Sequence, residues 1–375
     1  MELSAEQAAI QDAVREVAVE EIRPAVDEDE STFPEDVWET LADLDVTGLT
    51  VPSAHGGFDA DRLTYAVVNE ELAYGSLSVA TALSVHCLVT SCIARFGDES
   101  VCAEWLPSMA DGRPVGAFAL SEPEAGSNPA EMSTTAHEDG DEYVIDGEKQ
   151  WITNGKRSGV VVVFARTDPD DPGSVTQFLV PKGTSGVEVG PAEDKLGLRA
   201  SDTTSLTFDG VRVPRRYRLT EEGRGLSAAL SILTGGRIGI AAQAVGLAQA
   251  ALDEATVYAE EREQFDGPIS EIQAIRHKLA EMQTTVQAGR LLTRDAARRF
   301  DRGEDARMAA SMAKYFASEG AMDVTNEAVQ IHGGYGYTSE YPVERLYRDA
   351  KVTTIYEGTT QIQKTVIARE MLGDG

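Results

Sequence analysis

Basic residues are scarce in this sequence: 33 Lys and Arg face 63 Asp and Glu, so the 375-residue chain has a formal net charge of −30. Because the phosphate backbone of a nucleic acid requires a basic footprint, this balance excludes a protein that binds nucleic acid along its whole length. The acidic residues are spread along the chain, and 42% hydrophobic residues is too many for a disordered acidic protein. We interpret the charge as a solvated surface and hypothesise an adaptation to concentrated salt, which would screen the self-repulsion.

Cysteine is also rare, and Cys87, Cys92 and Cys102 show neither an even number nor a paired CxxC spacing. This pattern argues against both a disulfide framework and a thiolate zinc site, so we expect three buried, reduced thiols. The sequence begins Met-Glu-Leu-Ser-Ala-Glu and has neither a basic region nor an apolar stretch there. We therefore expect no secretory signal and a cytoplasmic protein.

Charged residues are missing between positions 75 and 94, a run long enough to be tested as a membrane span. The run contains several Ser and Thr together with His86, and no basic residue flanks its start. These features predict a buried core helix and no membrane span.

Domain organisation follows from length and from changes in local pattern. The chain exceeds the roughly 250 to 300 residues at which a single hydrophobic core stops growing, so two or more packed units are expected. Helical signals dominate at first, β-branched runs and turn residues follow, and helical periods then return. We expect an N-terminal α-helical domain at 1–115, a central β domain at 116–224 and a C-terminal α-helical bundle domain at 225–375.

Several helices are marked by local signals. Ser4 and Gln7 have capping-box spacing, and Pro24 marks where the first helical pattern should end or kink. A second helix is predicted from Pro34 to Gly48, with the glycine as its C-cap. Apolar residues at helical intervals predict a bundle of long helices at 238–259, 272–286 and about 306–331.

Strands are indicated in the central region by β-branched runs. Two of these runs precede an Asp-Gly pair, Asp146-Gly147 and Asp209-Gly210, which predicts a turn after each. The predicted strands are 143–145, 160–164, 177–180 and 205–208.

Motifs for several common chemistries are missing. The sequence contains no GxxxxGK[ST] phosphate loop, no GxGxxG between a strand and a helix, no HExxH and no GxSxG elbow. The five histidines lie far apart and show no metal-ligand spacing. We therefore expect no metal site and no enzyme of the Ser-His-Asp type.

Four Gly-rich or uncharged islands serve no obvious core purpose and are candidate ligand-binding segments. In the last of them Glu357 stands alone among apolar and hydroxyl residues, a setting that can raise a carboxyl pKa into the range of a general base. By spacing alone, a lone Glu is more often a solvated side chain, and the other islands are more often packed turns. The islands are residues 118–127, 151–154, 330–337 and 354–361.

In order and spacing, these islands together resemble the acyl-CoA dehydrogenases, and the resemblance runs from about Leu3 to Leu372. The segment 236–241, Gly-Arg-Ile-Gly-Ile-Ala, looks most like the short-chain, butyryl-CoA-type branch. The matching motifs are Ser121-Glu122-Pro123 with Gly126-Ser127, Trp151-Ile152-Thr153, Gly236-Arg237-Ile238, Arg262 with Phe265, Gln273, and Tyr356-Glu357-Gly358-Thr359.

The resemblance implies an α+β multidomain fold with an N-terminal helical domain, a central β-barrel or sandwich domain and a C-terminal four-helix bundle. It also implies a homotetramer with one FAD per subunit, an acyl-CoA substrate and an electron-transfer flavoprotein as redox partner. The implied FAD contacts, in this or a neighbouring subunit, are Phe118, Leu120, Ser121, Gly126, Ser127, Trp151, Ile152, Thr153, Arg262, Phe265, Gln273, Gln330, Ile331, His332, Gly333, Gly334, Thr359, Thr360 and Gln361.

Glu357 matches the family's catalytic base, which removes the Cα proton of the thioester while the Cβ hydrogen leaves as hydride to flavin N5. The family stabilises the enolate oxygen with a flavin ribityl hydroxyl and the backbone N–H of the base, an oxyanion-hole arrangement. Burial would bring the carboxyl closer in pKa to the activated substrate. The implied substrate contacts are Ser127, Thr234, Arg237 and Gly358.

Substrate preference is only partly indicated. Gly236 stands where some branches place the base, so no acid competes with Glu357, and the run 75–94 lacks the Arg of the glutaryl branch. We expect a linear, uncharged acyl chain that becomes a trans-2-enoyl-CoA, with the chain length left open. Departures from the family pattern are Asn128, Thr234, Gly235 and Asp266.

Two alternatives stay open. The first is a flavin oxidase of the same fold that reacts with O2, and the second is a catalytically silent relative that serves as an assembly or binding protein. Glu357 and the matching FAD contacts are intact, which favours the dehydrogenase over the silent relative.

Overall fold

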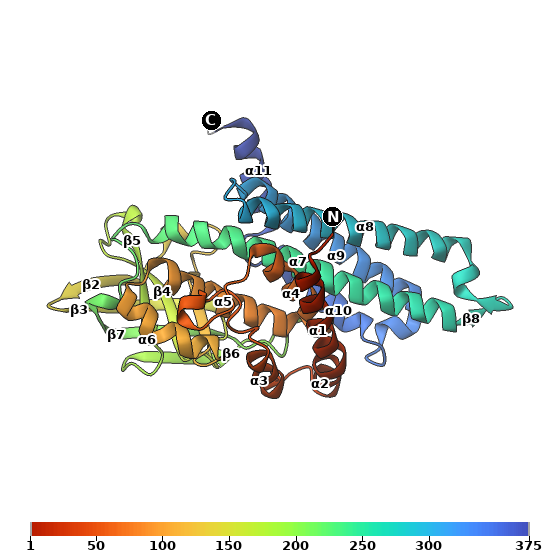
Figure 1. The fold of residues 1–375 in the computed structure, drawn as a ribbon, viewed down its shortest axis with the longest axis horizontal. Helices are drawn as coiled ribbons and strands as arrows, with labels where there is room; N and C mark the ends of the chain where they lie inside the picture. The colour runs from red at the N-terminus through yellow and green to blue at the C-terminus, as the bar shows by residue number, and fades with distance from the viewer. Residues whose placement is uncertain (1, 374–375) are drawn as a thin grey trace.

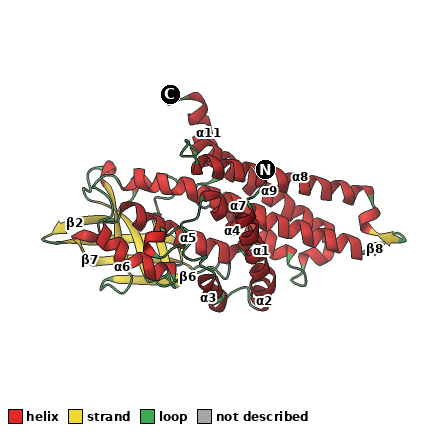
Figure 2. Ribbon diagram, viewed as in Figure 1, coloured by secondary structure: helices red, strands yellow, loops and turns green. Residues whose placement is uncertain are grey.

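Helices, a β-sheet and more helices follow one another along the chain, as predicted (Figures 1 and 2). The computed structural model describes residues 2–373, so Met1 and residues 374–375 of the predicted end domains lie outside the described residues. The sheet occupies one end of the long axis, and the tips of the long C-terminal helices occupy the other (Figure 1). The N-terminal helices are α1 (Ala5–Val17), α2 (Arg23–Glu28), α3 (Glu35–Asp43), α4 (Arg62–Gly75), α5 (Leu77–Phe96) and α6 (Glu99–Ala110).

The first helix begins with the predicted capping box, in which Ser4 and Gln7 each donate a backbone N–H to the other's side chain at 3.1 Å. The chain does not leave the helical path before Pro24. A π-helical turn, Ala18–Ile22, joins α1 to α2 without a break, and Pro24 follows it as the second residue of α2. The irregularity at Pro24 is therefore a π-helical turn inside one continuous helical path.

The predicted helix from Pro34 to Gly48 is wrong at its C-terminal end, because α3 stops at Asp43. Asp45 has a left-handed φ of 59°, which ends the helical path. Val46 and Leu49 are buried at 4% and 3% exposure, but from a turn and not from a helix.

The uncharged run is a buried core helix, as predicted. Two helices, α5 and α7 (Gly225–Glu261), are long and apolar enough to cross a bilayer, but 89% and 72% of their most apolar stretches are buried inside the protein. His86 is fully buried in α5 and joins three elements: its Nδ1 accepts from Gly116 N at 3.1 Å, and its Nε2 lies 3.1 Å from Met109 O. Cys87, Cys92 and Cys102 are free and buried, as predicted.

The central strands form one seven-stranded, hydrogen-bonded sheet with the order β1-β4-β2-β3-β7-β6, and β5 pairs with β4. Strand β4 is the centre of this arrangement, because it pairs with β1, β2 and β5 and is buried over Val160–Ala165. The strands are β1 (Gly116–Ala119), β2 (Thr135–Asp139), β3 (Glu142–Thr153), β4 (Val160–Arg166), β5 (Val175–Pro181), β6 (Val187–Ala192) and β7 (Thr203–Pro214).

The two Asp-Gly pairs are not the predicted turns. They lie within β3 and β7, which pair with each other and shift register between Ile145 and Gly147. Gly147 has a φ of 149°, and Gly210 donates its N–H to Asp146 Oδ1 at 2.8 Å. A bulge needs the same positive φ and local acceptor as a hairpin turn, so the pairs alone did not distinguish the two.

The C-terminal helices are built around α7, which runs from the sheet to the far end of the molecule (Figure 1). A two-stranded hairpin, β8 (Glu263–Gln264) and β9 (Gly267–Pro268), follows at that far end. The remaining helices are α8 (Gln273–Asp301), α9 (Arg307–His332), α10 (Val343–Ala350) and α11 (Thr360–Leu372), of which α11 projects from the others.

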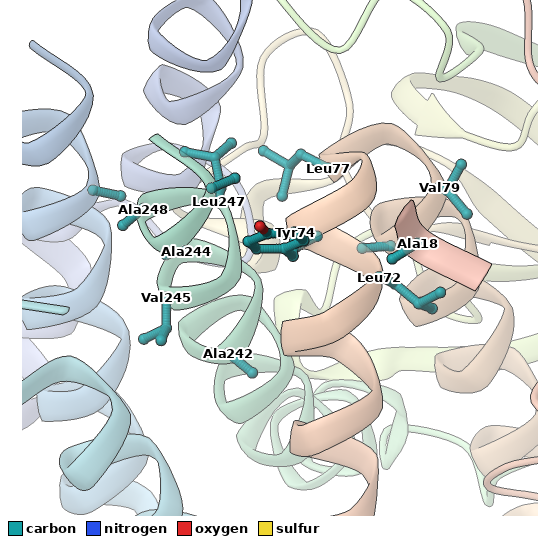
Figure 3. Packing of buried hydrophobic residues seen from close by; sticks show 14 of the residues in the cluster. Ala18, Leu72, Tyr74, Leu77, Val79, Ala242, Ala244, Val245, Leu247 and Ala248 are labelled. Atoms are coloured by element: carbon teal, nitrogen blue, oxygen red, sulfur yellow. The ribbon is translucent and has the colours of Figure 1, made fainter. Parts of the chain in front are cut away.

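One buried cluster joins the N-terminal and C-terminal helices, and a second joins the sheet to α5 and α6. Figure 3 shows part of the first cluster, with Tyr74 and Leu77 beside Ala244 and Leu247 of α7. Helices α4 and α7 approach so closely that a Cβ on Gly246 would lie 1.9 Å from the carbonyl oxygen of Glu70. Small side chains on α7 therefore set the distance between the two helical domains.

We expect Gly246→Ala to lower the thermal stability, because the added methyl would push α4 and α7 apart, at a cost of about 1–3 kcal/mol. The melting temperature, followed by circular dichroism, measures this effect. Gly183→Ala is the matched control, since nothing lies within 4 Å of a Cβ there and its φ is not positive. Equal melting temperatures for Gly246→Ala and the parent protein would contradict the close packing.

Candidate active site

Glu357 lies in the short connection between the 3₁₀ segment Lys351–Thr354 and α11. It has a φ of 51° and Gly358 has a φ of 93°, so two consecutive residues are left-handed. This conformation costs nothing at Gly358 but is costly at Glu357 unless the surroundings hold it. Gln363 donates from Nε2 to the carbonyl oxygens of Glu357 at 3.3 Å and Gly358 at 3.0 Å, and Lys314 donates from Nζ to Gly358 O at 2.8 Å.

The carboxylate of Glu357 packs against α7 at a glycine. A Cβ on Gly236 would lie 2.3 Å from Glu357 Oε2, so the absent side chain is what leaves room for the carboxylate. Next to the acid, the Tyr356 hydroxyl donates to Gln243 Oε1 at 3.1 Å, and Gln243 donates to Asn69 Oδ1 at 2.8 Å. Contacts from α7, α9 and α11 thus position Glu357 together.

Charges around Glu357 are buried and incompletely paired. Burial raises the pKa of Glu357 to about 7, although the nearby charges of Arg237 and Lys314 act in the opposite direction. Glu357 Oε2 and Arg237 Nε are both buried without a hydrogen-bond partner among the described residues. Orphaned polar atoms of opposite charge around one space indicate that a polar ligand belongs between them.

A pocket of about 260 Å³ lies beside this cluster, between α4, α5 and the N-terminal half of α7. The Arg62 side chain lines it and would lie 2.9 Å from a Cβ on Gly235, the residue next to Gly236. Arg62 also covers the rings of Tyr65 and Phe300, at 4.6 and 4.9 Å from their centroids. The consecutive glycines therefore bring the pocket and the carboxylate to adjacent points on α7.

Among the residues expected to bind substrate, Arg237 and Gly358 belong to this cluster. Thr234 is buried at 6% exposure, and its hydroxyl donates to Leu230 O within α7. Ser127 is exposed in the connection after β1. No described contact joins Ser127 to Glu357, so its expected role depends on a ligand that spans the two.

Glu122 holds the predicted cofactor segment 118–127. Its carboxylate accepts from Lys149 Nζ at 2.8 Å and from the backbone N–H groups of Ser133 and Thr134 at 2.6 and 3.0 Å. Burial opposes ionisation of Glu122, but Lys149 and these hydrogen bonds outweigh it and hold the pKa at about 2. Because Lys149 is fully buried on β3, this ion pair ties the segment to the sheet.

Around this anchor, most predicted cofactor residues are accessible to a ligand. Gly126 and Ser127 are exposed, and Phe118, Leu120, Ser121 and Thr153 are partly buried. Trp151 is 60% exposed and has a φ of 62°, whereas Ile152 is buried. An exposed Trp on a strained, well-anchored backbone is a suitable platform for a flat aromatic ligand.

A second predicted cofactor set surrounds a pocket of about 500 Å³ at the far end of α7 and α9. His332 is buried there and stacks on Tyr258 at 4.1 Å; its Nδ1 is bonded to Ala328 O, and its Nε2 has no partner within residues 2–373. Burial lowers the pKa of His332, which favours the neutral form of its ring. The pocket is also lined by Arg262, Ile331, Gly333 and Gly334.

The two cofactor sets do not meet within one chain. Phe265 is 90% exposed on the β8–β9 hairpin, at the end of the molecule opposite the sheet (Figure 1). Asp266 in this hairpin has a φ of 74°, a left-handed conformation that Asp tolerates better than most residues. Gln273 and Gln330 are exposed, and Thr359, Thr360 and Gln361 lie at the start of α11.

These features fit a large cofactor that carries both an aromatic ring and polar groups. In the first set, the exposed Trp151 ring can stack on an aromatic part of the cofactor. In the second set, the unpartnered Nε2 of His332 can hydrogen-bond to a polar part of it. Together with a buried carboxylate near two cations, they are typical of an enzyme that works with a large bound cofactor.

Comparisons with known proteins identify the family. The N-terminal, middle and C-terminal domains of acyl-CoA dehydrogenase match residues 4–113, 117–211 and 223–372 of this chain. The chain therefore belongs to the acyl-CoA dehydrogenase family and is an oxidoreductase.

Several relatives match over nearly the whole length. An acyl-CoA dehydrogenase of Bacillus subtilis is 44% identical over 100% of both chains. The mitochondrial short-chain specific acyl-CoA dehydrogenase of Bos taurus is 42% identical over 96% of this chain and 88% of its own. An acryloyl-CoA reductase (NADH) of Anaerotignum propionicum is 40% identical over 99% of this chain and 95% of its own.

Solved structures agree with this assignment and with the three-domain fold. Butyryl-CoA dehydrogenase from Megasphaera elsdenii superimposes with a TM-score of 0.96 at 38% identity, over 99% of both chains. A chain from a structure described as the electron transferring flavoprotein of Acidaminococcus fermentans superimposes with a TM-score of 0.97 at 40% identity, over 100% of both chains. Glutaryl-CoA dehydrogenase from Mycobacterium smegmatis, in complex with FADH2, gives 0.94 at 33% identity over 99% of this chain and 96% of its own. FAD is the cofactor of this family.

Sequence reasoning missed the residues that support the site, Lys314, Gln363 and the Glu122–Lys149 pair. A signal for Lys314 existed, because Ala310, Ala313, Ala317 and Ala321 mark a buried face of α9 and Lys314 lies beside it. No comparable signal marked Gln363, since its importance comes from where the preceding loop folds.

The ionisation of Glu357 should be visible in protein stability. The pKa of Glu357 is about 7 in the folded protein and about 4.5 in the unfolded chain. Between these two pH values the carboxyl ionises in the unfolded chain but stays protonated in the folded protein. The free energy of unfolding therefore falls as the pH rises from about 4.5 to 7. Glu357→Gln removes this cost, and we expect its stability advantage over the parent protein to grow across that window by roughly 2 kcal/mol.

Melting temperatures of the FAD-containing proteins between pH 5 and 8 measure this difference. Glu340→Gln is the control, because Glu340 is exposed. The difference in melting temperature between Glu340→Gln and the parent protein should not change with pH. A constant gap for Glu357→Gln as well would show that the Glu357 carboxyl is not held neutral by burial.

Proposed function

We propose that this protein removes two hydrogens from the α and β carbons of a linear acyl-CoA thioester to give the trans-2-enoyl-CoA. The observation that carries the proposal is the buried carboxylate of Glu357, with Oε2 unpartnered over Gly236 and with Arg237 and Lys314 as its nearest opposing charges. A carboxyl with a pKa near 7 accepts a proton far more readily than one in water.

In the proposed reaction, Glu357 Oε2 accepts the α-proton and becomes a neutral acid. FAD, when bound, supplies the acceptor for the β-hydrogen with its electron pair. The backbone N–H of Glu357 makes no hydrogen bond to another described residue, so it is available to the thioester oxygen. Burial of the site excludes water, which would otherwise solvate the carboxylate and weaken it as a base.

For the substrate, we propose contacts with Ser127, Thr234, Arg237 and Gly358, and we assign the acyl group to the 260 Å³ pocket beside Gly235. Leu88, Ile232 and Phe300 give this pocket apolar surface that suits an acyl chain, and Arg62 and Arg95 also line it. Because Arg62 lines the pocket, an acyl-CoA with a negatively charged end, such as glutaryl-CoA, is the informative substrate to compare with an uncharged one.

We further propose a homotetramer in which one FAD contacts both cofactor sets, each from a different subunit. The exposure of Trp151 and Phe265, at distant points of one chain, supports this arrangement. An electron-transfer flavoprotein is the proposed redox partner, and the similarity to a chain from such a study supports it. We expect a cytoplasmic location.

Anaerobic titration with butyryl-, octanoyl-, isovaleryl- and glutaryl-CoA, while the flavin spectrum is recorded, tests the reaction and ranks the acyl groups. We expect bleaching by a linear, uncharged acyl-CoA. Glu357→Gln should retain FAD and the folded structure but lose most of the bleaching rate, because the amide cannot accept the proton.

Other outcomes of this titration would contradict the proposal. Bleaching of Glu357→Gln at the parent rate would remove Glu357 as the base. Rapid reoxidation of the reduced protein by O2 would favour the oxidase, and a protein that binds no FAD would favour the silent relative.

We also propose that the excess of acidic residues is an adaptation to concentrated salt. Salt screens repulsion between exposed charges, so the melting temperature should rise by several degrees between about 0.1 M and 2 M KCl. Sucrose at equal osmolality is the control for solute exclusion from the protein surface. A melting temperature that does not rise in KCl beyond the sucrose control would contradict the proposal.

A further inference from the structure

Lys314 is a buried lysine in a chain that has only eight lysines and 25 arginines. It lies on α9 with its side chain 0% exposed, among small residues of the helical core. Its ammonium group has three N–H donors, and the described hydrogen bonds satisfy one of them, to Gly358 O at 2.8 Å. A core position of this kind would be occupied at lower cost by an apolar side chain.

The charges around Lys314 explain what offsets this cost. Burial lowers the pKa of Lys314 to about 8, while the nearby charge of Glu357 acts in the opposite direction. Arg237 on α7 lowers the pKa further, and Glu319, one turn along α9, raises it. Lys314 has no carboxylate within salt-bridge distance among residues 2–373. Its electrostatic partner is therefore Glu357, at longer range.

The hydrogen bond of Lys314 acts on the backbone that carries Glu357. Gly358 has a φ of 93°, and its carbonyl oxygen accepts from both Lys314 and Gln363. Gln363 belongs to α11, which directly follows the loop, whereas Lys314 belongs to α9 and is 44 residues away from Gly358 in sequence. Lys314 therefore ties the backbone just after Glu357 to α9, whereas Tyr356 ties the residue just before it to α7 through Gln243.

We propose that Lys314 is a positioning residue for the reaction, which ties the Gly358 carbonyl to α9 and keeps the Glu357 carboxylate ionised over Gly236 when substrate arrives. This inference rests on the proposed function of Glu357 as the base. Lys314 contributes both a hydrogen bond, which sets where the carboxylate lies, and a positive charge, which favours its charged form without neutralising it by direct contact.

The test uses the FAD-containing protein with Lys314→Met, which removes the charge, and Lys314→Arg, which retains it. The readout is the pH dependence of flavin reduction by saturating acyl-CoA in a stopped-flow instrument. For Lys314→Met we expect the rate of flavin reduction to be at least about tenfold lower. We also expect the acid limb of the pH–rate profile, where the rate falls as Glu357 is protonated, to shift upward by about one pH unit, because the ionised Glu357 has lost a favourable charge.

Lys314→Arg should return the acid limb toward that of the parent protein even if its rate stays reduced. Lys351→Met is the matched control, since Lys351 is exposed six residues before Glu357, and it should leave both rate and pH profile unchanged. If Lys314→Met does not fold with FAD, Lys314→Gln replaces it, because Gln retains a donor without a charge.

Stability gives a second readout that does not depend on turnover. The pH-dependent stability gap that Glu357→Gln produces should widen when it is measured in the Lys314→Met background, because the folded carboxyl is then harder to ionise. A lower rate with an unshifted acid limb and an unchanged gap would overturn the proposal and leave Lys314 a structural residue. Failure of the proposed function is distinguishable, because Glu357→Gln would then keep its flavin reduction rate.

Discussion

The burial of ionised groups around Glu357 is the constraint on which the rest of the active site depends. A carboxylate held away from water needs compensation, and here Arg237 and Lys314 provide it from two different helices without closing a direct ion pair. A direct pair would satisfy the carboxylate and leave it a poor base. The incomplete compensation, visible as Oε2 and Nε atoms without partners among the described residues, is what the proposed role of Glu357 as a base requires.

Small residues make this arrangement sterically possible. Gly235 and Gly236 give Arg62 and Glu357 their places against α7, and Gly246 lets the same helix lie directly on α4. These three glycines belong to one helix interior, where glycine is unfavourable for helix stability. Long-range packing offsets that local cost, because α7 is shared by the sheet, the N-terminal helices and the bundle (Figure 1).

Exposed and buried charges have different roles in this molecule. A large excess of acidic residues covers the surface, whereas the fully buried ion pair of Glu122 and Lys149 and the buried Lys314 organise the two halves of the site. The Glu122–Lys149 pair anchors the proposed cofactor segment to the sheet, and Lys314 anchors to α9 the loop that carries Glu357, the proposed base. Screening by salt affects the exposed charges far more than the buried ones.

The order and type of the elements and the buried character of α5 could be predicted from the sequence, because periodicity and capping depend on neighbours along the chain. Glu357 became the candidate base only through the resemblance to the acyl-CoA dehydrogenases, since its spacing alone favoured a solvated side chain. The same local signals failed where distant contacts decided the outcome. The helix predicted to Gly48 ended at Asp43, and the Asp-Gly pairs became bulges because β3 and β7 pair across them. Lys314, Gln363 and the separation of the two cofactor sets were decided only by the tertiary structure. The physical reason is that the cost of burying a charge, and the partner that offsets it, are defined by long-range packing and not by the residues beside it in sequence.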